Sequence, residues 1–256
     1  MSDGAIIGSL DLTTLLFMAF TLFFIGLVFY LRREDRREGY PLEADTTGKL
    51  EEPGAVWFPT RKAFKLPSGE TVFKPDMTRD APSPNMERLA VWPGAPSQPV
   101  GDPMAAGVGP GAYAQREDKP DLTHENLPKI VPMRALPDFD VARPKIDPRG
   151  MTVIGADGES AGVISDIWVD RAEALVRYYE VELAKGGRKV LLPFAFTNIR
   201  GKARKALVSA IQASQFAGVP AHKSPDQVTR LEEEKISAYY GAGTLYATSD
   251  KAEPWF

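Results

Sequence analysis

The chain has 256 residues, of which 31 are basic and 34 are acidic, and it contains no cysteine. The absence of cysteine excludes disulfide bonds and thiolate metal sites, and it agrees with a reducing compartment. The two histidines, His124 and His222, are far apart in the sequence, which argues against a histidine-rich metal site. The net charge is −3, whereas nucleic-acid-binding proteins usually have an excess of basic residues, so no nucleic acid is expected as a partner.

Residues 12–31 form an apolar run without a charge or a proline, and Asp11 is its expected N-cap. About twenty helical residues, each rising about 1.5 Å, span the roughly 30 Å hydrocarbon core of a bilayer. A signal peptide is one alternative, but its apolar core is only about 7–15 residues long and follows a basic N-terminus. A buried core helix is the other, and the length of the run argues against it. The sequence predicts one membrane-spanning helix.

The charges around this helix predict its orientation. Residues 1–31 contain no lysine or arginine, whereas four arginines follow within six residues. Basic residues beside a span stay on the cytoplasmic side, so residues 1–11 are expected outside and residues 32–256 inside. Aromatic side chains with a polar tip suit the membrane surface, and arginines there meet anionic headgroups. The predicted lipid and interface residues are Tyr30, Arg32, Arg33 and Tyr40.

Residues 32–144 are interrupted by many prolines, which disfavour long helices. Disorder is one interpretation of this composition. Large aromatic side chains such as Trp57, Phe64 and Trp92 instead favour an extended segment that lies against the rest of the chain or a partner. Alternating residues around a Ser-Gly turn predict a hairpin over residues 63–73.

Residues 145–256 are predicted to form a mainly β domain. Short β-rich runs separated by turn signals favour a small barrel or a sandwich. Residues 205–210 fit a final strand or one helical turn equally well. The predicted strands are residues 151–155, 161–165, 166–170, 176–183, 189–193 and 194–199.

One helix is predicted near the C-terminus. Ser224 resembles an N-cap, Pro225 suits the first helical position, and Gln227 stands three residues after the cap. The helix is expected to continue toward Tyr240 and to stop at Gly241.

No hydrolase, phosphate-loop, dinucleotide or zinc motif is present, so no catalytic constellation is predicted. The glycine-rich stretch at residues 107–111 is interpreted as a turn, because no strand precedes it.

Carboxylates beside the predicted strands are the most informative polar feature. Clustered carboxylates raise one another's affinity for protons, so one of them can hold a proton near neutral pH. A solvated face of the domain is the alternative interpretation. The residues are Asp166, Asp170, Glu173, Glu180 and Glu182, with Arg177 four residues after Glu173.

A second polar cluster lies in the proline-rich segment and consists of Asp118, Asp121, His124 and Glu125. A surface histidine titrates near about pH 6.5 and therefore suits proton capture. An ordinary exposed loop histidine is the alternative interpretation of His124.

Several segments, in their order and spacing, resemble the H subunit family of purple bacterial photosynthetic reaction centres. The resemblance covers nearly the whole chain, and the region from about 145 to 205 looks like the small PRC-type β-barrel of that family. The segments include residues 37–42, Gly107-Val108-Gly109-Pro110, residues 129–133, Asp166-Ile167-Trp168-Val169-Asp170, residues 180–183, residues 216–220 and Leu231-Glu232-Glu233-Glu234-Lys235-Ile236.

The resemblance implies a subunit that binds no pigment and is not an enzyme by itself. It would cross the bacterial inner, intracytoplasmic photosynthetic membrane once, with its N-terminus in the periplasm. Its cytoplasmic domain would cap two pigment-bearing core subunits, L and M, shield the quinone sites and help pass protons to the secondary quinone. The partner subunits would hold bacteriochlorophyll, bacteriopheophytin, quinones, a non-haem iron and a carotenoid. Membrane lipids, a cytochrome subunit and light-harvesting antenna are further candidate partners.

By the same resemblance, Asp170 and Glu173 match acidic proton-path positions and Arg177 a neighbouring arginine. Glu233 looks like an acid near the quinone pocket, and Asp121 like one near the proton entrance. Some members have an aspartate and two histidines at that entrance, whereas this chain has one histidine, followed by an acid. The implied proton-transfer residues are Glu173, Asp170, Arg177, Glu233, Asp121, His124 and Glu125.

Two other functions remain open at this point. A membrane-tethered adaptor would use its β-barrel to bind a soluble partner. A single-pass enzyme would need a nucleophile–base pair or a metal site, and the sequence offers neither.

Overall fold

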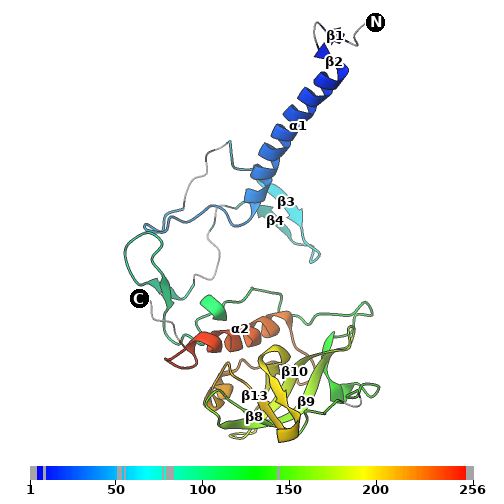
Figure 1. The fold of residues 1–256 in the computed structure, drawn as a ribbon, viewed down its shortest axis with the longest axis vertical. Coiled ribbons are helices and arrows are strands. Elements are labelled where there is room, and N and C mark those ends of the chain that lie inside the picture. Colours follow the sequence, from blue (N-terminus) through cyan, green and yellow to red (C-terminus); the bar gives the residue numbers. More distant parts are fainter. Residues whose placement is uncertain are drawn as a thin grey trace. The chain divides into compact units, whose positions relative to one another are not determined.

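The computed structural model describes residues 5–7, 10–50, 54, 56–76, 78, 84–142 and 145–251 (Figure 1). The chain forms two compact units, Met1–Ser83 with Ala90–Pro96, and Pro84–Leu89 with Ser97–Phe256. The second unit therefore includes residues 97–144, which were predicted to be an extended segment before the β domain.

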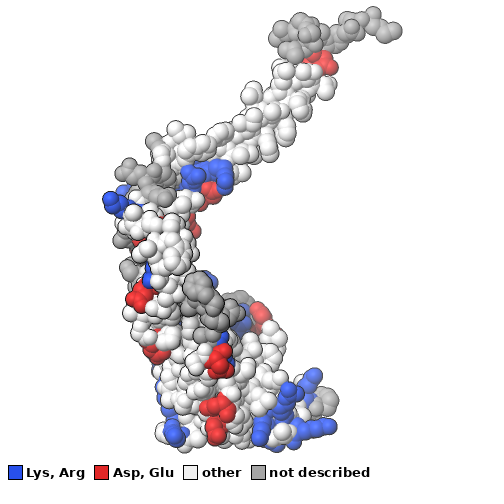
Figure 2. Space-filling view, turned by 60° about the vertical axis from the view of Figure 1, so that its left-hand side comes forward, with Lys and Arg blue, Asp and Glu red and all other residues white. Residues whose placement is uncertain are grey.

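The first unit contains the long apolar helix. Strands β1 (Ala5–Ile7) and β2 (Leu10–Asp11) form a short antiparallel pair, and helix α1 (Leu12–Glu34) follows. The Asp11 carboxylate accepts a hydrogen bond of 2.8 Å from the backbone N–H of Thr14, which confirms the predicted N-cap. The 23 residues of α1 extend about 34 Å, none of them is buried, and the helix is long and apolar enough to cross a membrane. The helix carries no charged side chains along most of its length, and basic side chains lie at its C-terminal end (Figure 2).

The last turn of α1 and the short 3-10 helix η1 (Asp35–Arg37) hold the following segment in place. The Arg37 guanidinium donates to the Thr60 carbonyl at 2.8 Å and to the Lys74 carbonyl at 3.2 Å. The ring of Phe29 stacks on Trp57 at 5.2 Å between centroids. The predicted hairpin is confirmed, because β3 (Lys62–Lys65) pairs antiparallel with β4 (Thr71–Lys74).

A seven-stranded sheet forms the centre of the second unit. Its strand order is β11-β10-β9-β8-β13-β12, and β7 also pairs with β9. All its pairings are antiparallel except that of β13 with β8. A separate small hairpin pairs β5 (Met86–Arg88) with β6 (Ser97–Pro99). The sheet strands are β7 (Ile130–Pro132), β8 (Thr152–Ile154), β9 (Ser160–Asp170), β10 (Leu175–Leu183), β11 (Lys189–Pro193), β12 (Asn198–Arg200) and β13 (Lys205–Leu207).

Strand β9 organises this sheet, and it is one strand where the sequence predicted two. Its first residues pair with β8, whereas Trp168 to Asp170 pair with β7, so part of the proline-rich segment is a strand of the sheet. Residues 205–207, which fitted a strand or a helical turn, form β13. Short 3-10 helices occupy Gly109–Gly111 (η2), Met133–Ala135 (η3), Phe194–Phe196 (η4), Gly201–Ala203 (η5) and Ala213–Gly218 (η6).

Helix α2 (Arg230–Tyr246) completes the core of the second unit. Tyr240 is fully buried, and its ring stacks on Phe196 and meets Phe216 edge-on. Trp168 from β9 belongs to the same hydrophobic core. The mostly β domain with one C-terminal helix agrees with the predicted fold class.

The predicted boundaries of α2 are wrong at both ends. Thr229 rather than Ser224 is the N-cap, because Thr229 and Glu232 form a reciprocal capping box. Ser224 instead forms an isolated bridge with Gln227. The helix also continues past Gly241 to Tyr246, and a side chain at position 241 would collide with the Pro110 carbonyl. This glycine permits close packing and does not end the helix.

Candidate functional site

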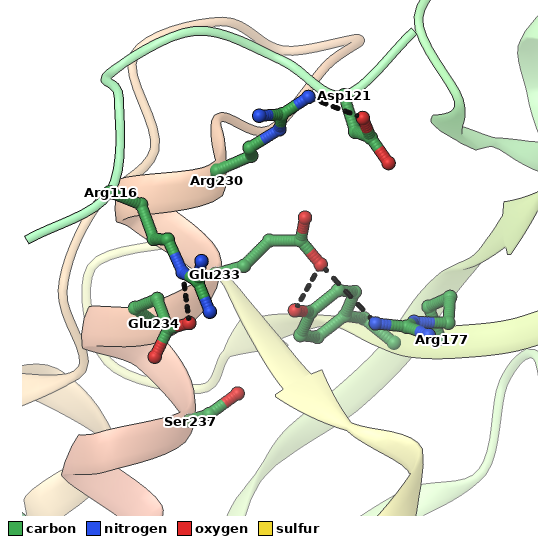
Figure 3. Close-up of a pocket in the computed structure, with 8 residues that line it drawn as sticks. Arg116, Asp121, Arg177, Arg230, Glu233, Glu234 and Ser237 are labelled. Carbon is green, nitrogen blue, oxygen red and sulfur yellow. Dashed lines mark hydrogen bonds and ion pairs between the residues drawn. The ribbon is translucent and has the colours of Figure 1, made fainter. Parts of the chain in front are cut away.

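A pocket of about 470 Å³ lies between α2, β10 and the loop that contains Arg116 and Asp121 in the second unit (Figure 3). Its lining is almost entirely polar. In Figure 3 the Glu233 side chain extends from α2 toward Arg177 of β10. The lining residues are Arg116, Asp121, Arg177, Tyr178, Arg230, Glu233, Glu234 and Ser237.

Glu233 is the least exposed acid of this pocket, with 16% of its side chain accessible. Its Oε2 accepts a hydrogen bond of 2.9 Å from the Tyr178 hydroxyl and lies 3.6 Å from Nη2 of Arg177. Burial raises the pKa of Glu233 above its usual value, and nearby Asp121 and Asp170 raise it further. Tyr178 and Arg177 oppose this rise without cancelling it. The pocket thus contains a carboxyl group that keeps its proton to a higher pH than an ordinary glutamate.

Burial, with the charge of Glu233 as a second cause, raises the pKa of Tyr178 well above its usual value. Tyr178 consequently stays neutral and remains a hydrogen-bond donor to Glu233.

Two ion pairs border the same pocket. Arg230 Nη2 lies 2.8 Å from Oδ1 of Asp121, and Arg116 Nε lies 3.2 Å from Oε1 of Glu234. The hydrogen bond from Arg230 lowers the pKa of Asp121. Asp121 is therefore ionised at neutral pH, whereas the pKa of Glu233 is raised.

Lys129 joins the two predicted inner acids at the turn between β9 and β10. Its ammonium lies 3.2 Å from Oδ2 of Asp170 and 3.1 Å from Oε1 of Glu173. Hydrogen bonds to Glu173 and then Asp170 raise the pKa of Lys129, so it stays charged. Asp170 is buried and also accepts the backbone N–H groups of Ala172 and Glu173, whereas the Glu173 side chain is half exposed.

Arg177 contacts Glu233 and is not the cation that lies beside Glu173. Arg177 lies four positions after Glu173, a spacing that brings side chains together on a helix but not along a turn and a strand. Lys129 takes the expected place of the arginine. Because Asp170 raises the pKa of Glu233, the turn and the pocket share one electrostatic environment.

His124 and Glu125 lie at the tip of an exposed loop, outside the pocket lining. The His124 side chain is 91% exposed, and its Nε2 lies 3.9 Å from Oε1 of Glu125. The loop is closed by backbone hydrogen bonds from Thr123 to Leu127 and from Lys129 to Asp121. Asp121 and Lys129 at its base therefore connect this loop to the pocket and to the inner acids.

A buried ionic network centred on Glu180 was missed by the sequence reasoning. Its carboxylate accepts hydrogen bonds from Lys189 at 2.7 Å, Ser165 at 2.8 Å and Arg134 at 3.0 Å. Burial raises the pKa of Glu180, but these three donors outweigh burial and hold it at about 2. The sequence pattern identified Glu180 as an acidic residue beside a predicted strand. Its partner Arg134 lies 46 residues away in the sequence, and no motif in the sequence links the two positions.

Arg134 also ties this network to the chain that leads into α2. It lies 3.0 Å from Oδ2 of Asp166 and donates to the Pro225 carbonyl at 2.5 Å. Trp168 donates its indole N–H to Glu180 at 3.2 Å. Because α2 carries Glu233, Arg134 helps to fix the helix that forms one wall of the pocket.

The predicted interface residues lie at the end of α1. Tyr30 and Arg32 are exposed, and Arg33 reaches the Phe58 carbonyl at 3.5 Å. The Arg36 guanidinium lies 5.5 Å from the centroid of the Tyr40 ring. Across the residues that the structure describes, no group of three or more acidic or histidine side chains is arranged to hold a metal ion.

In the part of the chain that the structure describes, these features define a protein with one helix suited to crossing a membrane and a mostly β domain that carries a polar, protonatable pocket. Residues 4–135 match the family model for the photosynthetic reaction centre, H-chain N-terminal region, and residues 146–215 match the PRC-barrel domain. The chain belongs to the photosynthetic reaction centre H-chain family. It is therefore a structural reaction centre subunit that associates with other subunits of that complex.

Proposed function

We propose that this subunit caps the L and M subunits of a photosynthetic reaction centre, shields the quinone sites and conducts protons to the secondary quinone. The H-chain family match supports the assembly, and the pocket around Glu233 supports the proton path. The partner subunits would carry bacteriochlorophyll, bacteriopheophytin, quinones, a non-haem iron and a carotenoid.

One observation carries the proton-transfer proposal: Glu233 is a mostly buried carboxyl group with a raised pKa that faces an open polar pocket. A group that relays protons must gain and lose them readily near the working pH, and a carboxyl group with a raised pKa meets this condition. Asp121 lies at the pocket wall, and Asp170 acts electrostatically on Glu233. The proposed path leads from Asp121 to Glu233 and the pair Asp170–Glu173, with His124 and Glu125 as candidate entrance groups.

The proposed membrane is the bacterial inner, intracytoplasmic photosynthetic membrane. The arginines at the end of α1 support a periplasmic N-terminus and a cytoplasmic main domain. A cytochrome subunit and light-harvesting antenna are candidate additional partners.

The variant Glu173→Gln tests the path because it keeps the side-chain shape and removes the titration. We expect the first light-driven electron transfer to the secondary quinone to be nearly unchanged and the second, proton-coupled reduction to slow. Each tenfold loss corresponds to about 1.4 kcal/mol of added barrier. Weak acids that diffuse into the site should partly restore the rate.

The matched control is Glu182→Gln, which removes an exposed carboxylate from the neighbouring strand β10. It should leave both electron transfers unchanged. If Glu173→Gln assembles normally and reduces the quinone at the native rate over about pH 6–9, the assignment of Glu173 fails.

A further inference from the structure

The hairpin β3–β4 exposes one complete face. Its register pairs Ala63 with Phe73 and Lys65 with Thr71, so these four side chains lie on the same side. All four are exposed, and Phe73 keeps 49% of its surface accessible. The Arg61 guanidinium lies 5.5 Å from the centroid of the Phe73 ring and extends this face. We call Arg61, Ala63, Lys65, Thr71 and Phe73 the outer face of the hairpin.

Hydrogen bonds hold the open end of this hairpin, where β3 begins and β4 ends, at the end of α1. The Arg37 guanidinium donates to the carbonyl of Thr60, which precedes β3, and to the carbonyl of Lys74, the last residue of β4. Arg37 is itself fixed by Glu34 through two hydrogen bonds of 2.8 Å. Since α1 is just long enough to cross the hydrocarbon core, its arginine end lies at the level of the lipid headgroups. The hairpin is therefore held beside the membrane surface.

The hairpin is also positively charged. Residues 61–74 contain four basic side chains and one acid, Glu70. Lys74 is paired with Asp76 at 2.8 Å. In the described parts of the chain, Arg61 and Lys65 have no carboxylate within ion-pair distance. Two cations with no carboxylate partner among the described residues thus flank an exposed aromatic ring.

We propose that the outer face of the β3–β4 hairpin binds the headgroups of anionic phospholipids in the bilayer that α1 crosses. Arg61 and Lys65 contact the phosphates, and the Phe73 ring enters the boundary between headgroups and acyl chains. Anionic lipids attract basic segments next to a membrane span, and apolar side chains such as phenylalanine are buried at the boundary between headgroups and acyl chains. The inference rests on the membrane crossing by α1 and is independent of the proposed proton path.

Lipid explains the outer face better than a protein partner does. The face is small, and a stable protein interface needs about 800 Å² from each partner, far more than five side chains provide. A fluid lipid surface needs no shape complementarity, and its negative charge matches the cations of the hairpin.

Because this chain contains no cysteine, a single label can be attached to it before it is assembled into the complex. Ser68→Cys places a single label at the turn between β3 and β4. The labelled complex is reconstituted into bilayers of phosphatidylcholine alone or with phosphatidylglycerol. Energy transfer to an acceptor on the lipid headgroups then reports how closely the hairpin approaches the surface.

We expect stronger energy transfer in the bilayers that contain phosphatidylglycerol. The difference should shrink at about 1 M salt, where the screening length is about 3 Å. Each neutralised cation should shift the ratio of docked to released hairpin by about fivefold, equivalent to about 1 kcal/mol. The double variant Arg61→Gln with Lys65→Gln should therefore remove most of the effect, whereas Arg61→Lys with Lys65→Arg should retain it.

The matched control is Lys202→Gln with Lys205→Gln, which removes the same charge from exposed positions in the second unit. It should leave the energy transfer unchanged. Equal transfer in neutral and anionic bilayers, or a label shielded from lipid by another subunit of the complex, would overturn the proposal. So would a double variant that keeps the full preference for anionic bilayers.

Discussion

The Tyr178 hydroxyl donates a hydrogen bond of 2.9 Å to Oε2 of Glu233. This bond joins strand β10 to helix α2 across the wall of the pocket. It stabilises the ionised form of Glu233, yet burial dominates and the pKa of Glu233 stays above its usual value. The hydrogen bond therefore limits how far the proton affinity of this buried acid rises.

Removing the hydroxyl group should raise the pKa of Glu233 further. In Tyr178→Phe the ionised carboxylate loses a donor, so a larger fraction of Glu233 is protonated at each pH. Infrared difference spectra should show the carboxylic acid C=O band of Glu233 persisting to a higher pH than in the native protein. Glu233→Gln identifies the band by abolishing it, and an unchanged titration in Tyr178→Phe would contradict the prediction.

Glu233 should also make stability depend on pH. Its pKa is raised in the folded protein, so its contribution is fully present below the unfolded value near 4.5 and is lost as the pH rises through the folded pKa. Relative to Glu233→Gln, the native chain should lose unfolding free energy across this range. Urea unfolding of the full-length chain in detergent at a series of pH values measures the difference. If the unfolding free energies of the native chain and of Glu233→Gln change with pH in parallel, the raised pKa of Glu233 is refuted.

Arg134→Gln should destabilise the second unit much more than Arg149→Gln. The two arginines are similarly accessible, with 39% and 37% of their side chains exposed. Arg134 neutralises the buried carboxylates of Asp166 and Glu180, whereas Arg149 pairs with exposed Asp147 and Asp140. Removing one partner of a buried pair costs about 3–5 kcal/mol, and an exposed pair contributes about 0–1 kcal/mol.

Unfolding of both variants by urea measures this contrast. We expect the loss of unfolding free energy in Arg134→Gln to be near the lower end of the range for a buried pair, because Lys189 still contacts Glu180. Equal losses in the two variants would mean that the burial of the carboxylates does not govern the effect.

Glu180 should contribute to unfolding in acid. Burial raises its pKa, but Lys189, Ser165 and Arg134 hold the pKa at about 2, below the ordinary value of 4.5. A lowered pKa gives stability that is present above pH 4.5 and is lost as the pH falls toward 2. The contribution at neutral pH is about 3 kcal/mol. Glu180→Gln should flatten the acid limb of the stability curve, while Glu182→Gln, at an exposed position of the same strand, should preserve it.

The orientation of α1 is open to a direct measurement. Protease added to sealed vesicles with the cytoplasmic side outward should remove the main domain, because the arginines at the end of α1 favour the cytoplasmic side. Vesicles of the opposite orientation are the control and should protect the domain. Protection in the first preparation would reverse the proposed topology.

The local features of this chain could be predicted from its sequence. An uncharged run bounded by Asp11 and Arg32 predicts a helix, because in lipid the backbone must satisfy its own hydrogen bonds. The Ser-Gly turn between alternating residues predicts the β3–β4 hairpin because its pairing is local. The start of α2 could also be predicted, because Thr229 and Glu232 have the spacing of a capping box. Ser224 followed by a proline is a competing N-cap pattern in the same segment.

The tertiary structure alone decided which charges meet. The sequence indicates that Asp170, Glu173 and Glu233 are acids, but their partners come from distant segments: Lys129 reaches the first two, and Tyr178 with Arg177 reaches the third. Likewise Arg134 meets Glu180 only because the Met133–Ala135 turn follows β7, which pairs with β9. Residue spacing determines neighbours along one helix or one strand, whereas the proton affinity of a buried acid depends on burial and on charges that only the folded chain brings together.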